Sequence, residues 1–192
     1  MADEAGEILN DDDELDAEAT ARRRMALAQI RQYPDSALRM QSREIGEIDD
    51  DVRRLAERMV GLMRDAHGIG LAGTQVGTLR RIFVFQNGDE PEPRVVVNGR
   101  ITNRSKDTTT DDEGCLSLQG VLVPVERNAK VTLEGTDLDG NDLKLELEGL
   151  PSRVVQHETD HLDGVLIIDR TDAASRKKAM ATLRPQPILV AR

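Results

Sequence analysis

The stretch VVQHETDHLDG, residues 154–164, holds two of the three histidines in the chain. His157 and His161 are four residues apart, and Glu158 directly follows the first of them. On a helix, side chains four residues apart lie one above the other, so the two imidazoles can bind one metal ion. Glu158 would then flank the metal, where a general base for a metal-bound water is needed. The spacing therefore predicts a metal-dependent hydrolase.

The same spacing also arises by chance on amphipathic helices, so the third metal ligand decides its meaning. Zinc peptidases with this motif take that ligand downstream, but residues 162–192 contain no Glu and no His. Ile167 stands where one peptidase group needs its last histidine. Cys115, the lone cysteine, is the obvious candidate, because thiolates bind divalent transition metals well. The alternative for Cys115 is a buried structural thiol.

Three helices are predicted, and one of them must carry the histidines. Pro151 suits the first turn of a helix and Gly164 suits its end, which predicts a helix over residues 151–162. An amphipathic helix is predicted to begin near the acids at 49–51. Its apolar residues, at steps of three and four, are Ile48, Val52, Leu55, Met59, Leu62, Met63 and Ala66. A last helix is expected over residues 172–183.

Strands are predicted in the stretches between these helices. RIFVF at 81–85 and RVVV at 94–97 are typical of strands. Residues 130–149 alternate apolar and polar on both sides of Asp139-Gly140, which predicts a hairpin. A calcium loop is not expected there, because the glycine required at its sixth position is Asp142. Strands followed by helices indicate an α+β domain.

The acidity of the chain is concentrated at its N-terminus. Residues 1–20 carry nine acids and no Lys or Arg, which leaves 27 acids and 26 bases in the rest. This composition predicts a disordered acidic tail at 1–20, with a partner-binding arm as the alternative. Residues 21–185 are expected to form a single domain, followed by a C-terminal tail at 186–192. With two Phe, one Tyr and no Trp, its core must be aliphatic.

Composition also excludes several classes of function. No basic footprint for nucleic acid is visible, and no apolar run approaches the length of a membrane span. No secretory leader is recognised, and a lone cysteine cannot form an internal disulfide. A cytoplasmic location is therefore expected. The oligomeric state is not predicted.

Three segments, taken in order, resemble the signature motifs of peptide deformylases. They are HGIGLAGTQVG at 67–77, DEGCLSLQG at 112–120 and VVQHETDHLDGVL at 154–166, and the likeness extends from about residue 30 to 170. The resemblance implies an α+β fold in which antiparallel sheets wrap around a central metal-binding helix. It also implies an enzyme that removes the formyl group from the N-terminal formylmethionine of new proteins and releases formate.

The resemblance assigns the metal site and the general base. Cys115, His157 and His161 would hold one divalent metal ion, with Fe²⁺ favoured and Zn²⁺, Ni²⁺ or Co²⁺ as substitutes. A metal-bound water would attack the formyl carbon. Glu158 would take the proton of that water and later deliver one to the departing amine.

Further residues are assigned by the same resemblance. The Gln75 side chain and the backbone N–H of Leu116 would stabilise the oxyanion. Glu113 and Arg127 would brace the cysteine loop, although an ordinary surface salt bridge is the alternative for this pair. The residues expected to contact the extended peptide and its methionine side chain are Ile69, Gly70, Leu150 and Val154. The partners implied are N-formylmethionyl nascent peptides, with contact to the ribosome left open.

The sequence departs from the common family pattern in three loops. Gly73-Thr74 replaces alanine followed by proline or a polar residue, while Gln119 and Gly99 stand where proline is usual. None of these changes removes a catalytic group. Two rival functions remain: a zinc peptidase with an unusual third ligand, and an inactive, metal-free binding protein. Intact Glu158 and Gln75 argue against the second, because binding alone needs neither residue.

Overall fold

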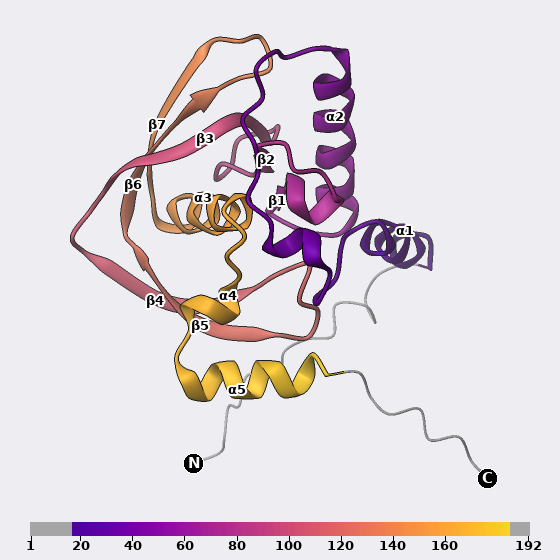
Figure 1. The fold of residues 1–192 in the computed structure, drawn as a ribbon, viewed down its shortest axis with the longest axis vertical. Coiled ribbons are helices and arrows are strands. Elements are labelled where there is room, and N and C mark those ends of the chain that lie inside the picture. The colour runs from indigo at the N-terminus through magenta and orange to yellow at the C-terminus, as the bar shows by residue number, and fades with distance from the viewer. Residues whose placement is uncertain (1–16, 185–192) are drawn as a thin grey trace.

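Figure 1 shows a computed structural model of the chain, which describes residues 17–184. The predicted C-terminal tail and residues 1–16 of the predicted acidic tail lie outside the described residues. The helices and strands are α1 (Ala17–Ala28), η2 (Ser36–Arg39), α2 (Asp50–Asp65), β1 (Gly70–Ala72), η3 (Gly73–Val76), β2 (Ile82–Phe85), β3 (Arg94–Arg104), β4 (Thr108–Gly114), β5 (Leu122–Asn128), β6 (Lys130–Thr136), β7 (Asp142–Glu148), α3 (Gly149–Leu162), α4 (Ile167–Arg170) and α5 (Ala173–Thr182).

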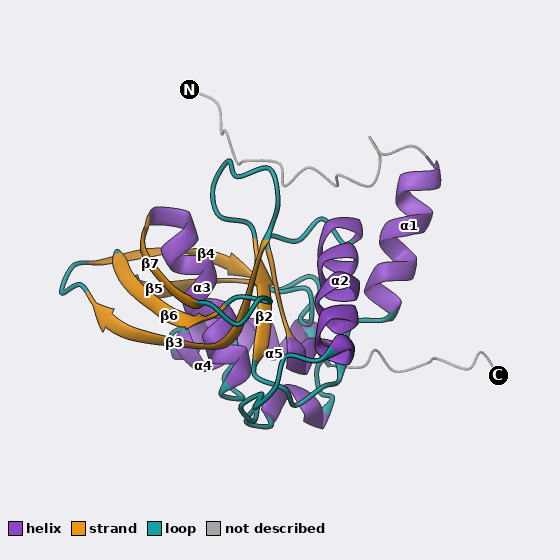
Figure 2. Cartoon of the chain, turned by 90° about the horizontal axis from the view of Figure 1, so that it is seen from above, coloured by secondary structure: helices purple, strands orange, loops and turns teal. Residues whose placement is uncertain are grey.

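The strands form two antiparallel sheets that enclose α3. One sheet has the order β1-β2-β3-β6-β7, and the other pairs β4 with β5. Helix α3 contacts strands of both sheets and lies between them in Figure 1. In the view of Figure 2, α2 stands beside the end of the larger sheet that carries β2. This arrangement confirms the predicted α+β fold around a central helix.

Helix α3 is enclosed because it can bury side chains on nearly every side. Ten of its 14 residues are buried. Val154, Val155 and Leu162 share an apolar cluster with Phe83 and Phe85 of β2. Pro151 lies in the first turn, and Gly164 follows the end of the helix, so the helix predicted over 151–162 is confirmed with an earlier start.

The amphipathic helix and the hairpin are also confirmed. Asp49 caps α2 by accepting a hydrogen bond from the N–H of Val52. Val52, Met59 and Met63 are buried on one face of α2, as the periodicity predicts. Strands β6 and β7 pair in the predicted hairpin, with Leu133 opposite Leu145. Helix α5 begins after a capping aspartate, Asp172, as expected for the last helix.

The predicted strand at 94–97 is too short. Strand β3 continues to Arg104 across an irregularity between Val97 and Arg100, where its register against β6 shifts. Asn98 has φ of 56°, and a Cβ on Gly99 would lie 2.7 Å from Phe83 Cε1. The Asn-Gly pair therefore forms a β-bulge inside a strand, where the sequence analysis placed a loop.

Strand β4 and helix α1 are among the elements that the sequence did not predict. Strand β4 has the sequence TTTDDEG, and Glu113 is its only buried residue. The strand therefore lacks the apolar alternation from which a strand is predicted. Residues 17–20, assigned to the disordered tail, instead form the first turn of α1. The predicted end of the tail at residue 20 was wrong, because three consecutive arginines interrupt the apolar pattern that would have indicated α1. The apolar face of α1 is formed by Ala26 and Leu27, which pack in the same core as α2.

The turn after α3 gives a test of backbone constraint. Gly164 has φ of +74°, and a Cβ there would lie 2.6 Å from the Arg39 carbonyl oxygen. Gly164→Ala should therefore lower the free energy of unfolding by at least about 2 kcal/mol. Gly61→Ala is the matched control: Gly61 lies inside α2 with nothing within 4 Å of an added Cβ.

The control should raise the free energy of unfolding by about 0.5–1 kcal/mol, because alanine favours a helix interior over glycine. Urea unfolding of both variants and the parent protein, all in the same chelator-containing buffer, measures the difference. If Gly164→Ala is as stable as the parent, the described turn does not hold this backbone in place.

Candidate active site

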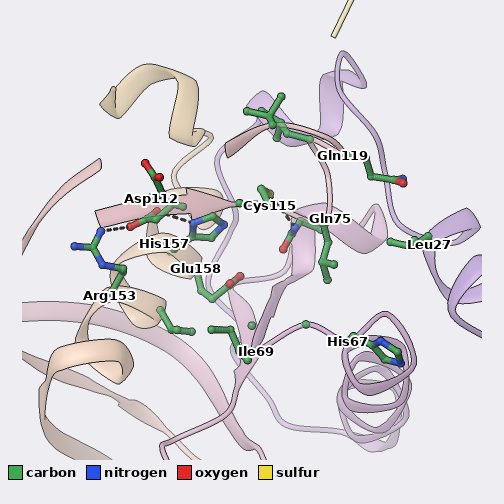
Figure 3. A pocket seen from close by; sticks show the side chains of 18 of the residues that line it. Leu27, His67, Ile69, Gln75, Asp112, Cys115, Gln119, Arg153, His157 and Glu158 are labelled. Carbon is green, nitrogen blue, oxygen red and sulfur yellow. Dashed lines mark hydrogen bonds and ion pairs between the residues drawn. The ribbon is translucent and has the colours of Figure 1, made fainter. Parts of the chain in front are cut away.

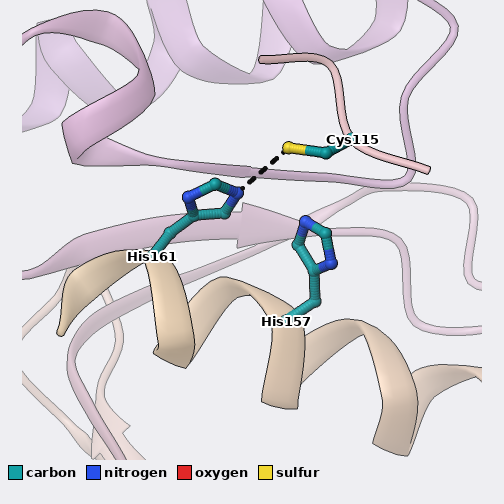
Figure 4. Close-up of side chains that lie close together, drawn as sticks. All are labelled: Cys115, His157 and His161. Carbon is teal, nitrogen blue, oxygen red and sulfur yellow. Dashed lines mark hydrogen bonds between the residues drawn. The ribbon is translucent and has the colours of Figure 1, made fainter. Parts of the chain in front are cut away.

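The three predicted metal ligands come together from two parts of the fold. Cys115 follows β4, while His157 and His161 lie on α3. One ligand atom from each residue lies within 4.8 Å of the others. Figure 4 shows the Cys115 sulfur against the His161 ring, with 3.2 Å between Sγ and Nε2. The thiol predicted from the sequence therefore faces both imidazoles.

A buried carboxylate orients the first histidine. Glu113 Oε2 lies 3.0 Å from His157 Nδ1. Arg127 donates two hydrogen bonds to the same carboxylate at 3.0 and 2.9 Å, and Arg153 donates a third at 2.7 Å. Burial alone would raise the pKa of Glu113, but the hydrogen bonds from His157 and Arg127 hold that pKa well below its usual value. A proton on Nδ1 leaves Nε2 of His157 as the atom that can bind a metal.

The carboxylate belongs to a larger charge network. Arg127 also donates to Asp160 at 2.5 Å, and Asp160 accepts two hydrogen bonds from Arg170. Arg153 also donates a hydrogen bond to the exposed Asp111 at 2.7 Å. The Glu113–Arg127 pair is thus buried and shared, whereas the sequence left an ordinary surface salt bridge as its alternative.

The sequence analysis missed Arg153 and Asp160 as members of this network. A signal for Arg153 was present, since it stands four residues before His157 and so shares its helical face. Asp160 follows the motif glutamate by two residues, and nothing in the spacing marks it as a partner of Arg127.

Glu158 is placed beside the cluster and is almost fully buried. Burial raises the pKa of Glu158 to about 7. Its Oε2 has no hydrogen-bond partner among residues 17–184. A Cβ on Gly70 would lie 2.2 Å from Glu158 Oε1. Glycine at position 70 therefore makes room for this carboxylate, a reason that the resemblance, which assigned Gly70 to the substrate, did not include.

Gln75 is fixed with its amide directed at the cysteine loop. Its Oε1 accepts from the Ala72 N–H at 2.8 Å, and its Nε2 donates to Ser117 Oγ at 3.1 Å. The same nitrogen lies 3.7 Å from Cys115 Sγ. The neighbouring Thr74, one of the departures from the family pattern, donates its hydroxyl to the His161 carbonyl at 3.2 Å. That departure thus supports the metal-site helix directly.

The cluster opens into a cavity of about 520 Å³, drawn in Figure 3. Its lining includes His157 and Glu158 together with the three apolar residues predicted to contact substrate, Ile69, Leu150 and Val154. Val154 is 5% exposed, whereas Ile69 and Leu150 are 46% and 59% exposed. Large apolar side chains left open at a cavity can bind an apolar ligand group. His161 and Arg127 are buried and are not among the lining residues.

The donor set fits a divalent transition metal. One thiol and two imidazoles make three of four tetrahedral ligands, which leaves one position open. Burial lowers the pKa of His157, but the Cys115 sulfur and the Glu113 carboxylate raise it well above its usual value overall. Burial and the neighbouring His157 lower the pKa of His161. The two imidazoles therefore differ in their affinity for a proton, with the pKa of His157 above its usual value and that of His161 below it.

Known proteins are similar to this chain in both the sequence and the fold that place these residues together. The sequence pattern of the family described as polypeptide deformylase matches residues 27–177. The chain belongs to the peptide deformylase family. The match confirms the resemblance read from the three motifs, and it covers every residue assigned to the site.

Named relatives and solved structures agree with this membership. A peptide deformylase of Desulforudis audaxviator is 40% identical over 154 residues, which are 80% of this chain and 99% of the relative. Peptide deformylase 1 of Corynebacterium glutamicum is 41% identical over 165 residues, 83% of this chain and 96% of the relative.

The crystal structure of a peptide deformylase from Legionella pneumophila has a TM-score of 0.76 and 34% identity, covering 80% of this chain and 91% of the other. That of a Synechococcus elongatus peptide deformylase in complex with actinonin has a TM-score of 0.75 and 33% identity, covering 82% and 91%. The family, the fold and the hydrolase class are thereby shown. Within residues 17–184, no helix of this family member has the length and apolar character needed to cross a membrane.

The buried carboxylate gives a prediction for metal binding. Glu113→Gln should weaken binding of Zn²⁺ or Co²⁺ about 10- to 100-fold, because the neutral amide binds the His157 ring and the two buried arginines less strongly than the carboxylate does. Asp111→Asn is the control, since it removes the exposed end of the same network. Chelator competition on folded protein measures both affinities. Equal losses in the two variants would show that Glu113 does not orient the ligand.

Proposed function

We propose that the chain is a peptide deformylase, which hydrolyses the formyl group from the N-terminal formylmethionine of newly synthesised proteins and releases formate. One observation carries this proposal: a thiol, two imidazoles and a buried carboxylate meet in one open cavity of a chain from this family. A binding protein would need neither the carboxylate nor the fixed amide of Gln75 beside it.

Cys115, His157 and His161 hold one divalent metal ion in this proposal. The family likeness favours Fe²⁺, and the sulfur and nitrogen donors also suit Zn²⁺, Ni²⁺ and Co²⁺. When bound, such an ion lowers the pKa of water and polarises the formyl oxygen. Glu113 and Arg127 keep the His157 ring in its binding orientation.

Glu158 moves the proton. It takes a proton from the attacking water and returns one to the amine of the departing methionine. Its pKa, raised to about 7 by burial, supports this role, because a group that titrates near neutrality can both accept and donate. Its unpartnered Oε2 is available to the water.

Gln75 and Leu116 stabilise the oxyanion. The Gln75 amide is held by Ala72 and Ser117, so its nitrogen needs little reorganisation to donate to the developing charge. Among residues 17–184, the Leu116 N–H donates to no protein group, while the Leu116 carbonyl accepts from Gln32. Two donors thus flank the cluster.

The peptide lies extended along the free edge of β1. The Gln86 N–H donates to the Ile69 carbonyl at 2.9 Å, on the side of β2. Hydrogen-bonding groups alternate sides in an antiparallel ladder, so the N–H and C=O of Gly70 face the free edge. The methionine side chain then enters the apolar lining formed by Ile69, Leu150 and Val154. The substrates in this proposal are N-formylmethionyl nascent peptides and the location is the cytoplasm, with contact to the ribosome left open.

The proposal is tested by formate release and metal content in one sample. Protein purified without oxygen should contain about one metal ion per chain and release formate from formyl-Met-Ala-Ser. A zinc peptidase would instead cleave internal bonds of unformylated peptides. Peptide cleavage without formate release would replace the proposal with that rival.

Glu158→Gln tests the proton transfer. The variant should keep its metal but lose at least about 10²-fold in kcat, the scale of general acid–base catalysis. Glu126→Gln, an exposed glutamate of β5, is the matched control and should keep the parent rate. Near-normal formate release by Glu158→Gln would remove this residue from the mechanism.

The formyl end of the substrate should be recognised strictly. In the proposed complex the formyl hydrogen faces the wall at Gly70, where Glu158 packs closely, and a methyl group in that place would meet this wall. Acetyl-Met-Ala-Ser should therefore show kcat/KM at least about a hundredfold below that of formyl-Met-Ala-Ser. Equal values would indicate a general deacylase.

A further inference from the structure

Helix α1 is a part of this chain that the family pattern does not explain. The pattern begins at residue 27, whereas α1 spans Ala17–Ala28. Almost the whole helix therefore precedes the shared domain. Yet Arg23 and Leu27 both line the cavity that contains Cys115 and Glu158.

The helix is held firmly against the catalytic domain. Ala26 and Ile30 are 2% and 3% exposed and share a core cluster with residues of α2. Just after α1, the Arg31 N–H donates to the Gln75 carbonyl at 2.7 Å, and the Tyr33 N–H donates to the Ser117 carbonyl at 2.9 Å. The chain that leaves α1 is thus bonded to the two loops that shape the site.

Arg23 and Leu27 point the same way because they are four residues apart on one helix. Both side chains are half-buried. Figure 3 shows Leu27 on the side of Cys115 away from Arg153, in the same region as Gln119 and His67. These residues form a wall of the cavity that the formyl group and the methionine side chain do not use.

We infer that α1 is an additional wall of the peptide groove, on which Leu27 and Arg23 contact the second and third residues of the substrate. The inference rests on the proposed function. An extended chain advances about 3.3 Å per residue, so two residues beyond the methionine reach about 7 Å further along the cavity. Leu27 offers them an apolar surface, and the Arg23 guanidinium favours an acidic side chain.

The test compares substrate pairs within each variant, so that a general loss of active enzyme cancels. The peptide amides are formyl-Met-Glu-Ser against formyl-Met-Lys-Ser, and formyl-Met-Ala-Glu against formyl-Met-Ala-Lys. Arg23→Glu should shift the kcat/KM ratio toward lysine at least about fivefold in one of the two pairs. Arg24→Glu, an exposed neighbour outside the cavity lining, should shift neither ratio more than about twofold.

A second pair of variants tests the apolar contact. Leu27→Ala should reduce the preference for formyl-Met-Leu-Ser over formyl-Met-Ala-Ser at least about threefold. Met25→Ala, which removes an exposed side chain of the same helix, should leave that preference unchanged. An excess effect of either cavity-lining variant over its neighbour supports the inference.

Two results would overturn it. If the parent releases no formate from formyl-Met-Ala-Ser, the proposed function fails and this inference fails with it. If the parent is active but Arg23→Glu and Leu27→Ala behave like Arg24→Glu and Met25→Ala, only the role of α1 is wrong.

Discussion

The site depends on one buried carboxylate. Glu113 is 6% exposed and is shared by His157, Arg127 and Arg153. A buried charge is costly unless it is paired and fully hydrogen-bonded. All three partners of Glu113 lie on helices or strands, which fix their positions. Arg127 comes from the neighbouring strand β5, and the other two partners come from α3. The charge network therefore joins the smaller sheet to the central helix and also orients His157, a proposed metal ligand.

The enclosed helix explains why the remaining groups can be placed so closely. Because α3 lies between two sheets, its His157 and His161 face Cys115, which lies in the loop that joins the two strands of the smaller sheet. Its Glu158 packs against the edge strand of the larger sheet, where only glycine leaves enough space. The free edge of that strand also borders the cavity. In the proposed mechanism, peptide recognition and proton transfer therefore both depend on Gly70, the first through its backbone and the second through the space that it leaves for Glu158.

The sequence predicted the parts of this site whose signal is local. The histidine spacing, the acids at the start of α2 and the alternation in the β6–β7 hairpin each follow from neighbouring residues. Cys115 was already the candidate third ligand, because residues 162–192 contain no Glu and no His. The roles of Gln75 and Leu116 came only through family likeness, because their partners lie far away in the chain. Strand β4 escaped notice because it is polar and almost entirely exposed. Asp160 escaped notice because its pairing with Arg127 depends on how the sheets close around α3, which no local pattern encodes. Arg153 was missed although its position, four residues before His157, places it on the same helical face.

The most direct test of this account is the set of atoms bound to the metal. X-ray absorption spectroscopy on the zinc-loaded protein should find one sulfur at about 2.3 Å and two imidazole nitrogens at about 2.0–2.1 Å. Such a shell would join Cys115, His157 and His161 in a single centre. A shell without sulfur, or with only one imidazole, would contradict the account, because the geometry around Glu113 would then serve some other purpose.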